Sequence, residues 1–327
     1  MESVSFWHEA VDLTPRPALD GDATADVAIV GAGLTGLWTA YYLQKRNPKL
    51  SILLIDKHVA GFGASGRNGG WSSALFPQTT ASLVSRYGFD RAKALRDAMV
   101  ETISEIGRVV KTEKIDCDWA HNGTIIYARS ALQEKELRAE VAETAALGID
   151  HLEWWDASRV AASGARGATF TPDCARVHPA KLVRRLADIV EKRGARIVEQ
   201  TTVTGWREGE VQTDRGTVTS KHIINATEGY GAAIRQTHRR ILPLYSLMIA
   251  TEPLPDAVWD AIGIEHGHTF SDGRHRVLEP RRFGDSICVR CAHRIFPGQY
   301  STCFTSPSFR RTSSLGSSLS PLLNLLR

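Results

Sequence analysis

The stretch DVAIVGAGLTG, residues 26–36, decides the fold. Its first five residues form a short, continuous apolar run, which is typical of a strand buried on both faces of a parallel sheet. The glycines that follow have the spacing G-x-G-x-x-G, and residues 37–46 read as a helix that ends at Asn47-Pro48. A second apolar run, residues 51–55, ends in Asp56. The pattern predicts a strand–glycine turn–helix–strand unit in an α/β, Rossmann-like domain.

Each glycine of this turn has a separate physical task if the turn holds a dinucleotide. Gly31 allows the tight turn, Gly33 lets the backbone approach a pyrophosphate, and Gly36 lets the helix pack close to the strand. The helix start supplies free N–H groups and partial positive charge to phosphates. Asp56, 20 residues after Gly36, can accept hydrogen bonds from both ribose hydroxyls. A chance glycine turn and a strand-end cap are the alternatives; strand, helix, second strand and acid in one register favour the dinucleotide site.

A second glycine-rich segment, residues 61–70, indicates which dinucleotide is bound. Five of its ten residues are glycine, so we expect an irregular loop and neither helix nor strand. A nicotinamide-binding fold does not need this second loop, whereas a flavin dinucleotide is larger and needs more donors nearby. Ser65 and Asn68 can hydrogen-bond phosphate or ribityl oxygens, and Arg67 can offset phosphate charge or lie near the flavin. FAD is therefore favoured over NAD, and the remaining alternative is a surface loop without a ligand.

These motifs resemble those of the D-amino-acid-oxidase-like FAD-dependent oxidoreductases, especially the branch with glycine, sarcosine and γ-glutamylputrescine oxidases. The similarity extends over roughly residues 5–275. The residues that carry it are 26–36, the pair Asp56-Lys57, residues 63–70 and residues 223–231. The motifs are specific for FAD and not for one substrate.

The resemblance implies a role for each matching position. The pyrophosphate is expected at the first turn and the adenosine ribose at Asp56, while the backbone of Val203 meets the adenine. The full set expected to hold FAD is Gly31, Ala32, Gly33, Gly36, Asp56, Lys57, Ser65, Arg67, Asn68, Gly69, Gly70, Val203, Ala226 and Thr227. Because the second loop contains no His, we expect FAD to be bound without a covalent link.

The resemblance also implies a reaction class. The expected activity is oxidation of the C–N bond of a small amine or amino acid to an imine, with dioxygen as acceptor and hydrogen peroxide as product. The flavin does this chemistry, so no protein acid or base is required and no catalytic residue is assigned. The alternatives are an NAD-linked dehydrogenase and an inactive, truncated FAD-binding remnant.

Composition sets the remaining expectations. The 327 residues carry 40 Lys and Arg against 36 Asp and Glu, a net charge of +4. After Asp285 there is no acid but five Arg, so the body is nearly neutral and no nucleic-acid partner is expected. Residues 1–10 do not form a signal peptide and no apolar run of about 18 residues occurs, so we expect no membrane association.

Only Cys117 and Cys174 lie in the body, which fits a reducing, cytoplasmic compartment. Zinc binding by Cys288, Cys291, His293 and Cys303 is set aside because the paired spacing is missing, so no metal is expected.

The expected organisation is discontinuous. Residues 1–25 form a lead-in, residues 26–80 and 151–235 the FAD-binding domain, and residues 81–150 and 236–280 an incomplete mixed-sheet (α+β) substrate domain. Helices are expected at 90–113, 131–147 and 179–193, a β-meander at 201–220, and strands at 195–199, 222–226 and 241–251. Residues 281–327 are expected to be an aberrant or disordered tail, because no acid and no lysine occurs after Asp285. A reading-frame shift or a truncated gene is favoured over a natural basic tail.

Overall fold

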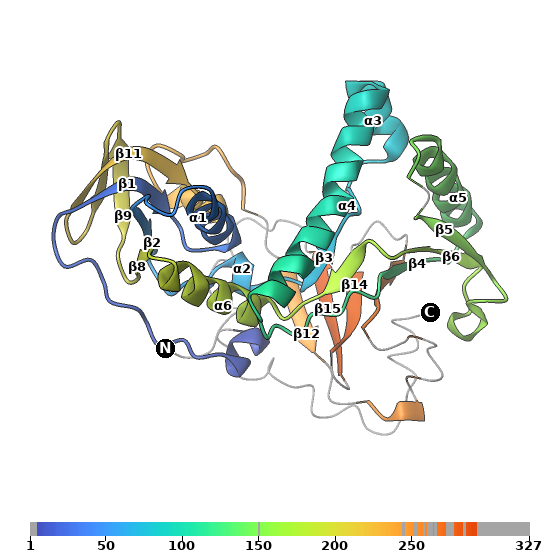
Figure 1. Ribbon diagram of the computed structural model, residues 1–327. Helices are drawn as coiled ribbons and strands as arrows, with labels where there is room; N and C mark the ends of the chain where they lie inside the picture. The colour runs from blue at the N-terminus through green and yellow to red at the C-terminus, as the bar shows by residue number, and fades with distance from the viewer. Residues whose placement is uncertain are drawn as a thin grey trace. The chain divides into compact units, whose positions relative to one another are not determined.

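The computed structural model describes residues 5–149 and 151–243, with shorter stretches between residues 246 and 292. The chain forms two compact units, each built from separate segments (Figure 1). The first contains residues 1–68, 113–117 and 178–245, and the second contains residues 69–112, 118–177 and 246–327.

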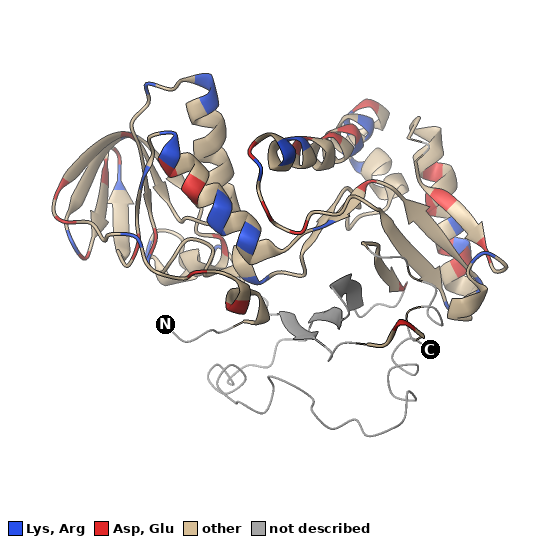
Figure 2. Cartoon of the chain, turned by 60° about the horizontal axis from the view of Figure 1, so that its bottom comes forward, with Lys and Arg blue, Asp and Glu red and all other residues tan. Residues whose placement is uncertain are grey.

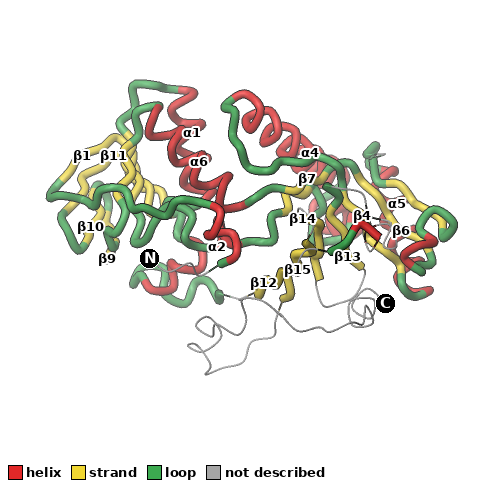
Figure 3. The backbone as a smooth tube through the Cα atoms, turned by 90° about the horizontal axis from the view of Figure 1, so that it is seen from below, coloured by secondary structure: helices red, strands yellow, loops and turns green. Residues whose placement is uncertain are grey.

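The first unit is a six-stranded sheet with helices. Its strands lie in the order β8-β2-β1-β11-β10-β9. Their bounds are β1 Ala23–Val30, β2 Ile52–Ile55, β8 Arg196–Val198, β9 Val203–Arg207, β10 Glu210–Thr213 and β11 Thr217–Asn225. The helices are α1 Leu34–Arg46, α2 Ala64–Arg67 and α6 Pro179–Lys192, with 3₁₀ turns η1 Phe6–Ala10 and η3 Glu228–Ala233. The first four strands are parallel, and β9 and β10 complete the sheet as an antiparallel meander. Figure 3 shows β1, β11, β10 and β9 beside one another as yellow strands.

The predicted glycine unit lies at the centre of this sheet. β1 pairs in parallel with both β2 and β11, and all four β2 residues are buried. α1 and α6 pack against each other beside the strands (Figure 1). Helix α6 begins with Pro179, whose missing N–H costs nothing at a first helical position, and Gly194 follows its C-cap at φ +100°. The Rossmann-like α/β class is therefore confirmed for this unit.

The lead-in is more ordered than expected. Strand β1 begins at Ala23, inside the predicted lead-in, and Trp7, His8 and Leu19 are almost fully buried. The indole of Trp7 makes an edge-to-face contact with His178, the N-cap residue of α6. Aromatic and apolar burial of this kind, scattered without a period, leaves no sequence pattern to detect.

The second unit combines a seven-stranded sheet with helices. The strands lie in the order β12-β15-β14-β13-β4-β6-β5, and only β13 and β4 are parallel. Their bounds are β4 Thr124–Ala128, β5 Glu153–Asp156, β6 Gly167–Thr171, β12 Ser246–Ala250, β13 Thr269–Asp272, β14 Leu278–Phe283 and β15 Ser286–Ala292. A separate pair is β3 Trp71–Ser73 with β7 Cys174–Arg176, and the helices are α3 Thr80–Tyr87, α4 Phe89–Thr112 and α5 Ala131–Ala146, with the 3₁₀ turn η2 Ala161–Ser163. Basic and acidic side chains are interspersed over helices of both units (Figure 2).

Several boundaries differ from the expected ones. Residues 151–177 belong to the second unit because β5 and β6 extend the sheet of β4. The last part of the expected meander and the expected strand at 222–226 form one strand, since β11 is continuous and pairs with β1 on both sides of residue 221. The expected loop at 61–70 contains a short helix, α2, with Gly66 inside it. At Gly66 an added Cβ would lie only 2.1 Å from the Gly61 carbonyl oxygen, so close packing requires glycine within this helical turn.

The tail expectation is also revised in part. Residues 286–292, placed in the aberrant tail, form β15 and pair with both β12 and β14. Residues 293–327 lie outside the described part of the chain, as do His293 and Cys303 of the rejected zinc set. Within the described part, no helix is long and apolar enough to cross a membrane.

Candidate functional site

The first glycine turn has room for backbone only. Gly31 has φ +108°, and a Cβ there would lie 2.6 Å from the Ala226 carbonyl oxygen. A Cβ at Gly36 would lie 2.1 Å from the Gly31 carbonyl oxygen, and one at Gly33 would lie 2.8 Å from the Ser65 hydroxyl. At each of these three positions an added Cβ would clash with another part of the protein, so this tightly packed turn, here called the glycine cradle, requires glycine.

The start of α1 is joined to the second glycine-rich loop. The Ser65 hydroxyl accepts a 2.9 Å hydrogen bond from the Leu34 N–H, the first amide of α1. Its own proton can still be donated to a phosphate oxygen. The first N–H groups of a helix have no partner within the helix and favour an anion. The two loops thus present backbone and hydroxyl donors at one helix terminus.

Asp56 lies directly after β2, where the sequence predicts it. Its carboxylate accepts 2.8 Å hydrogen bonds from the Ala32 N–H and the His58 N–H, one on each oxygen. Burial raises the pKa of Asp56 and the nearby charge of Glu199 adds to this, while the two amide bonds act in the opposite direction. Each oxygen retains a second lone-pair direction, so the carboxylate can still accept from two hydroxyl groups.

Arg67 and Asn68 have partners within the protein. The Arg67 guanidinium donates a 2.7 Å hydrogen bond to the Tyr230 hydroxyl and lies 4.9 Å from the centre of the Phe62 ring. The Asn68 amide donates to the Ala64 and Ser65 carbonyls and so completes the end of α2. Both residues shape the loop, whatever else they contact.

The segment after β11 closes over the first turn. The Ala226 N–H donates to the Val30 carbonyl at 2.8 Å, which brings the Ala226 carbonyl against Gly31. Thr227 is held by the Asn225 side chain, to which both its N–H and its hydroxyl donate. Val203 begins β9, and its side chain packs in the core of the sheet.

The first unit contains twelve of the fourteen predicted residues. Gly69 and Gly70 follow Asn68 directly but belong to the second unit, and Lys57 has an exposed side chain. Three residues around the site were missed by sequence reasoning, namely Arg16, Glu199 and Tyr230. Glu199 ends a predicted strand next to a buried core, and Tyr230 lies within residues 223–231, which carry part of the resemblance, so both had a weak signal. Arg16 had none.

The residues present fit a dinucleotide. The glycine cradle lets the backbone pack tightly at the start of α1, the helix terminus and the Ser65 hydroxyl offer donors for phosphates, and Asp56 offers acceptors for a ribose. Among the described residues, no group of His, Cys, Asp and Glu could hold a metal ion.

Comparison with known proteins identifies the family. Residues 26–319 match the family model described as "FAD dependent oxidoreductase". This interval continues past residue 275, where the sequence analysis placed the end of the resemblance.

Among curated proteins, the chain is 30% identical over 273 residues to the probable oxidoreductase OrdL of Haemophilus influenzae, covering 78% of this chain and 62% of that one. It is also 30% identical over 251 residues to γ-glutamylputrescine oxidoreductase of Escherichia coli, covering 74% of this chain and 58% of that one. The chain therefore spans less than two thirds of the length of either relative.

Solved structures agree on the fold. L-Proline dehydrogenase from P. horikoshii superposes with a TM-score of 0.65 at 15% identity, covering 85% of this chain and 72% of that one. Glycine oxidase from Geobacillus kaustophilus gives a TM-score of 0.60 at 21% identity, covering 84% and 75%. Together with the family match, the fold and the glycine cradle show that the chain belongs to the FAD-dependent oxidoreductase family, whose cofactor is FAD.

Proposed function

We propose that the protein uses FAD to oxidise the C–N bond of a small amine or amino acid. The observation that carries the proposal is the cradle made by Gly31, Gly33 and Ala226 at the start of α1, with Asp56 at the end of the neighbouring strand. The names of two similar proteins, γ-glutamylputrescine oxidoreductase and glycine oxidase, supply the substrate class.

The binding roles follow the contacts. The turn at Gly31, Ala32, Gly33 and Gly36 would hold the pyrophosphate, with the Ser65 hydroxyl as an added donor. Asp56 would accept the ribose hydroxyls, and the backbone at Val203 would meet the adenine. Ala226 and Thr227 would close over the pyrophosphate. Lys57, Arg67, Asn68, Gly69 and Gly70 complete the proposed set.

When bound, FAD would supply the two-electron redox chemistry by which the amine loses the hydride of its α C–H bond and one nitrogen proton to become an imine, while dioxygen would take up two electrons and two protons to become hydrogen peroxide. The residues of this chain bind and orient the cofactor. The Arg67 guanidinium, held by Tyr230 and Phe62, places a fixed positive charge beside the second loop. Since residues 61–70 contain no His, we propose that FAD is bound without a covalent link.

The setting of the reaction is also part of the proposal. Cys117 and Cys174 are buried and form no disulfide, which supports a reducing, cytoplasmic compartment. A small-molecule substrate and dioxygen are the proposed partners, without nucleic acid or membrane.

One observation favours a second candidate, an inactive FAD-binding remnant. The aligned part of the chain covers 62% and 58% of the two curated relatives, so the turnover of the complete relatives does not carry over to this chain by similarity alone. The decisive experiment reconstitutes the purified chain with FAD and measures peroxide release with a panel of amines and amino acids. FAD binding with peroxide release supports the oxidase, FAD binding without turnover supports the remnant, and reduction of NAD instead would contradict both.

A further inference from the structure

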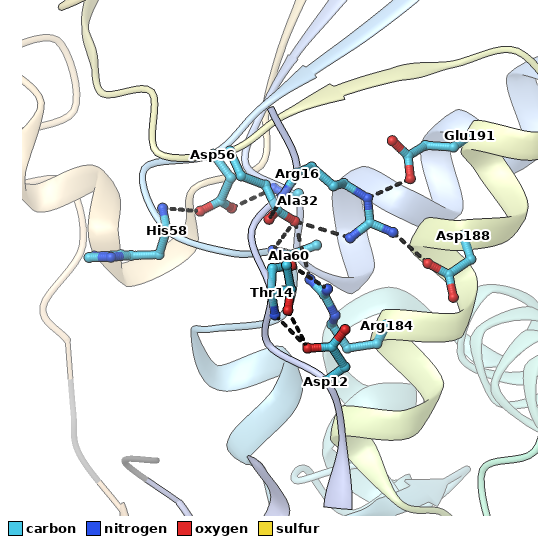
Figure 4. Close-up of polar contacts among 11 residues, drawn as sticks. Asp12, Thr14, Arg16, Ala32, Asp56, His58, Ala60, Arg184, Asp188 and Glu191 are labelled. Carbon is cyan, nitrogen blue, oxygen red and sulfur yellow. Dashed lines mark hydrogen bonds and ion pairs between the residues drawn. The ribbon is translucent and has the colours of Figure 1, made fainter. Parts of the chain in front are cut away.

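The segment Asp12–Leu19, here called the N-terminal strap, is fixed to the first unit by one arginine. The Arg16 guanidinium donates to three carboxylates, those of Asp188 and Glu191 on α6 and that of Glu199 after β8 (Figure 4). Its side chain is only 10% exposed and that of Glu199 is fully buried, so the Arg16–Glu199 pair is shielded from water, whereas the Asp188 side chain is 52% exposed. The Arg16 backbone N–H adds a 2.7 Å hydrogen bond to the second Glu199 oxygen.

Glu199 is the centre of this network. Its side chain is completely buried and accepts from the Arg16 backbone, from the guanidinium groups of Arg16 and Arg184 at 3.2 Å each, and from the Ala60 N–H at 2.8 Å. A buried carboxylate without its arginines would be a strongly unfavourable charge. The two arginines therefore allow an ionised acid at this position, and that acid holds the backbone at Ala60.

Ala60 belongs to the loop that Asp56 begins. The turn that starts with Glu199 contacts this loop twice more: the Thr201 N–H donates to the Asp56 carbonyl at 3.0 Å, and the Gln200 N–H donates to the His58 carbonyl at 3.1 Å. The strap reaches the same turn, since the Leu19 N–H donates to the Thr201 hydroxyl. The loop that carries the Asp56 carboxylate is thus held from one side by the Glu199 turn and, through it, by the strap.

We propose that Arg16 and Glu199 are positioning residues of the cofactor site: through Glu199, the strap fixes the loop 56–61 and so holds the Asp56 carboxylate for the adenosine ribose. This inference rests on the proposed function. It makes the strap part of the FAD site, although residues 12–19 carry no nucleotide-binding motif. The strap acts on the adenosine half of the cofactor, so the loss of its contacts weakens the binding of ADP and of FAD by the same factor.

The test uses the full chain and measures dissociation constants for FAD and for ADP. Arg16→Ala is expected to raise both dissociation constants about tenfold, which corresponds to the free energy of one lost hydrogen bond to a charged group. The matched control is Arg185→Ala, which removes an exposed α6 arginine that pairs with Asp188 but not with Glu199; both constants should stay within about twofold.

A double-mutant cycle separates positioning from simple stabilisation. In an Asp56→Asn background, Arg16→Ala should raise the dissociation constant for ADP by less than about twofold, because the carboxylate that Arg16 positions is already lost. Equal losses in both backgrounds, or a lowered melting temperature with unchanged ADP affinity, would overturn the inference.

A conservative variant covers the case in which Arg16→Ala does not fold. Arg16→Lys keeps a positive charge beside Glu199 but loses the planar fork, so an intermediate loss of ADP affinity is expected, and wild-type affinity would contradict the proposal. Failure of the wild-type chain to bind FAD would instead contradict the proposed function, which keeps the two failures distinct.

Discussion

The Arg67 guanidinium and the Tyr230 hydroxyl are joined by a 2.7 Å hydrogen bond that links the second glycine-rich loop to the segment after β11. Arg67 also lies over the Phe62 ring, and the Tyr230 ring covers Gly63, where a Cβ would lie 2.9 Å from it. The two segments predicted to line the cofactor thus restrain each other, and the restraint depends on a tyrosine to which the sequence analysis assigned no role.

Tyr230→Phe tests this link. The ring and its packing on Gly63 remain, but Arg67 loses one partner and gains rotamer freedom. We expect FAD affinity to fall by about two- to tenfold, which corresponds to about 0.5–1.5 kcal/mol for one hydrogen bond. Tyr87→Phe is the control, because Tyr87 is 45% exposed, close to the 49% of Tyr230, and lies in the second unit. Fluorescence titration with FAD measures both, and an unchanged constant for Tyr230→Phe would show that the hydrogen bond does not order the site.

Gly31→Ala tests the cradle against a matched glycine. Gly31 and Gly194 have nearly the same backbone angle, φ +108° and +100°, but a Cβ at Gly194 would meet nothing within 4 Å. Gly194→Ala should therefore cost only the backbone strain, about 1–2 kcal/mol. Gly31→Ala should cost about 1–3 kcal/mol more, because its Cβ meets the Ala226 carbonyl. Urea unfolding of both variants gives the difference, and equal losses would contradict the close approach of Ala226.

The core of the fold was predictable because its signals are local. Residues 26–56 contain apolar runs, glycine spacing and an acid in one register, and Pro179 and Gly194 delimit α6 directly. The short helix α2 was missed, because glycine content argues against a helix and only the Gly61 carbonyl, packed against Gly66, explains its presence.

The surroundings of the site could not be predicted, since they depend on contacts between distant residues. Arg16 and Glu199 are 183 positions apart, and neither belongs to a periodic pattern. The change in composition after Asp285 marked an end of the fold in the wrong place, because residues 286–292 pair as β15. Whether a reading-frame shift explains that composition stays a prediction, which sequencing of the gene beyond codon 275 can check.

His8 predicts a loss of stability in mild acid. Burial lowers the pKa of His8 to about 4, with the positive charges of Arg67 and Arg184 adding to the effect. Because the folded state disfavours the protonated ring, the unfolded chain binds the proton first as the pH falls below about 6.5. Stability should decline from there to about pH 4 and then level off, by a total on the order of 3 kcal/mol.

The measurement compares unfolding free energies between pH 4 and 7 for the wild type and His8→Gln. The variant lacks the titrating ring, so this part of the decline should vanish, whereas His121→Gln replaces an exposed histidine and should leave the profile unchanged. Parallel profiles for wild type and His8→Gln would show that His8 is not the group responsible.

The contact between Gly33 and Ser65 predicts a non-additive pair of substitutions. A Cβ at Gly33 would lie 2.8 Å from the Ser65 hydroxyl oxygen but 3.6 Å from the Ser65 Cβ, and the backbone at Gly33 has an ordinary φ of −85°. Gly33→Ala should thus cost about 1–3 kcal/mol through overpacking alone. Ser65→Ala removes the offending oxygen together with the cap on the Leu34 N–H, at about 1 kcal/mol. In the double variant the added methyl group makes only ordinary contacts. The stability lost in the double variant should therefore be smaller than the sum of the two single losses by at least about 0.5 kcal/mol. If chemical denaturation shows that the two losses are strictly additive, the two glycine-rich loops do not meet at this point. The Ser65 hydroxyl would then not belong to the proposed set of donors at the start of α1.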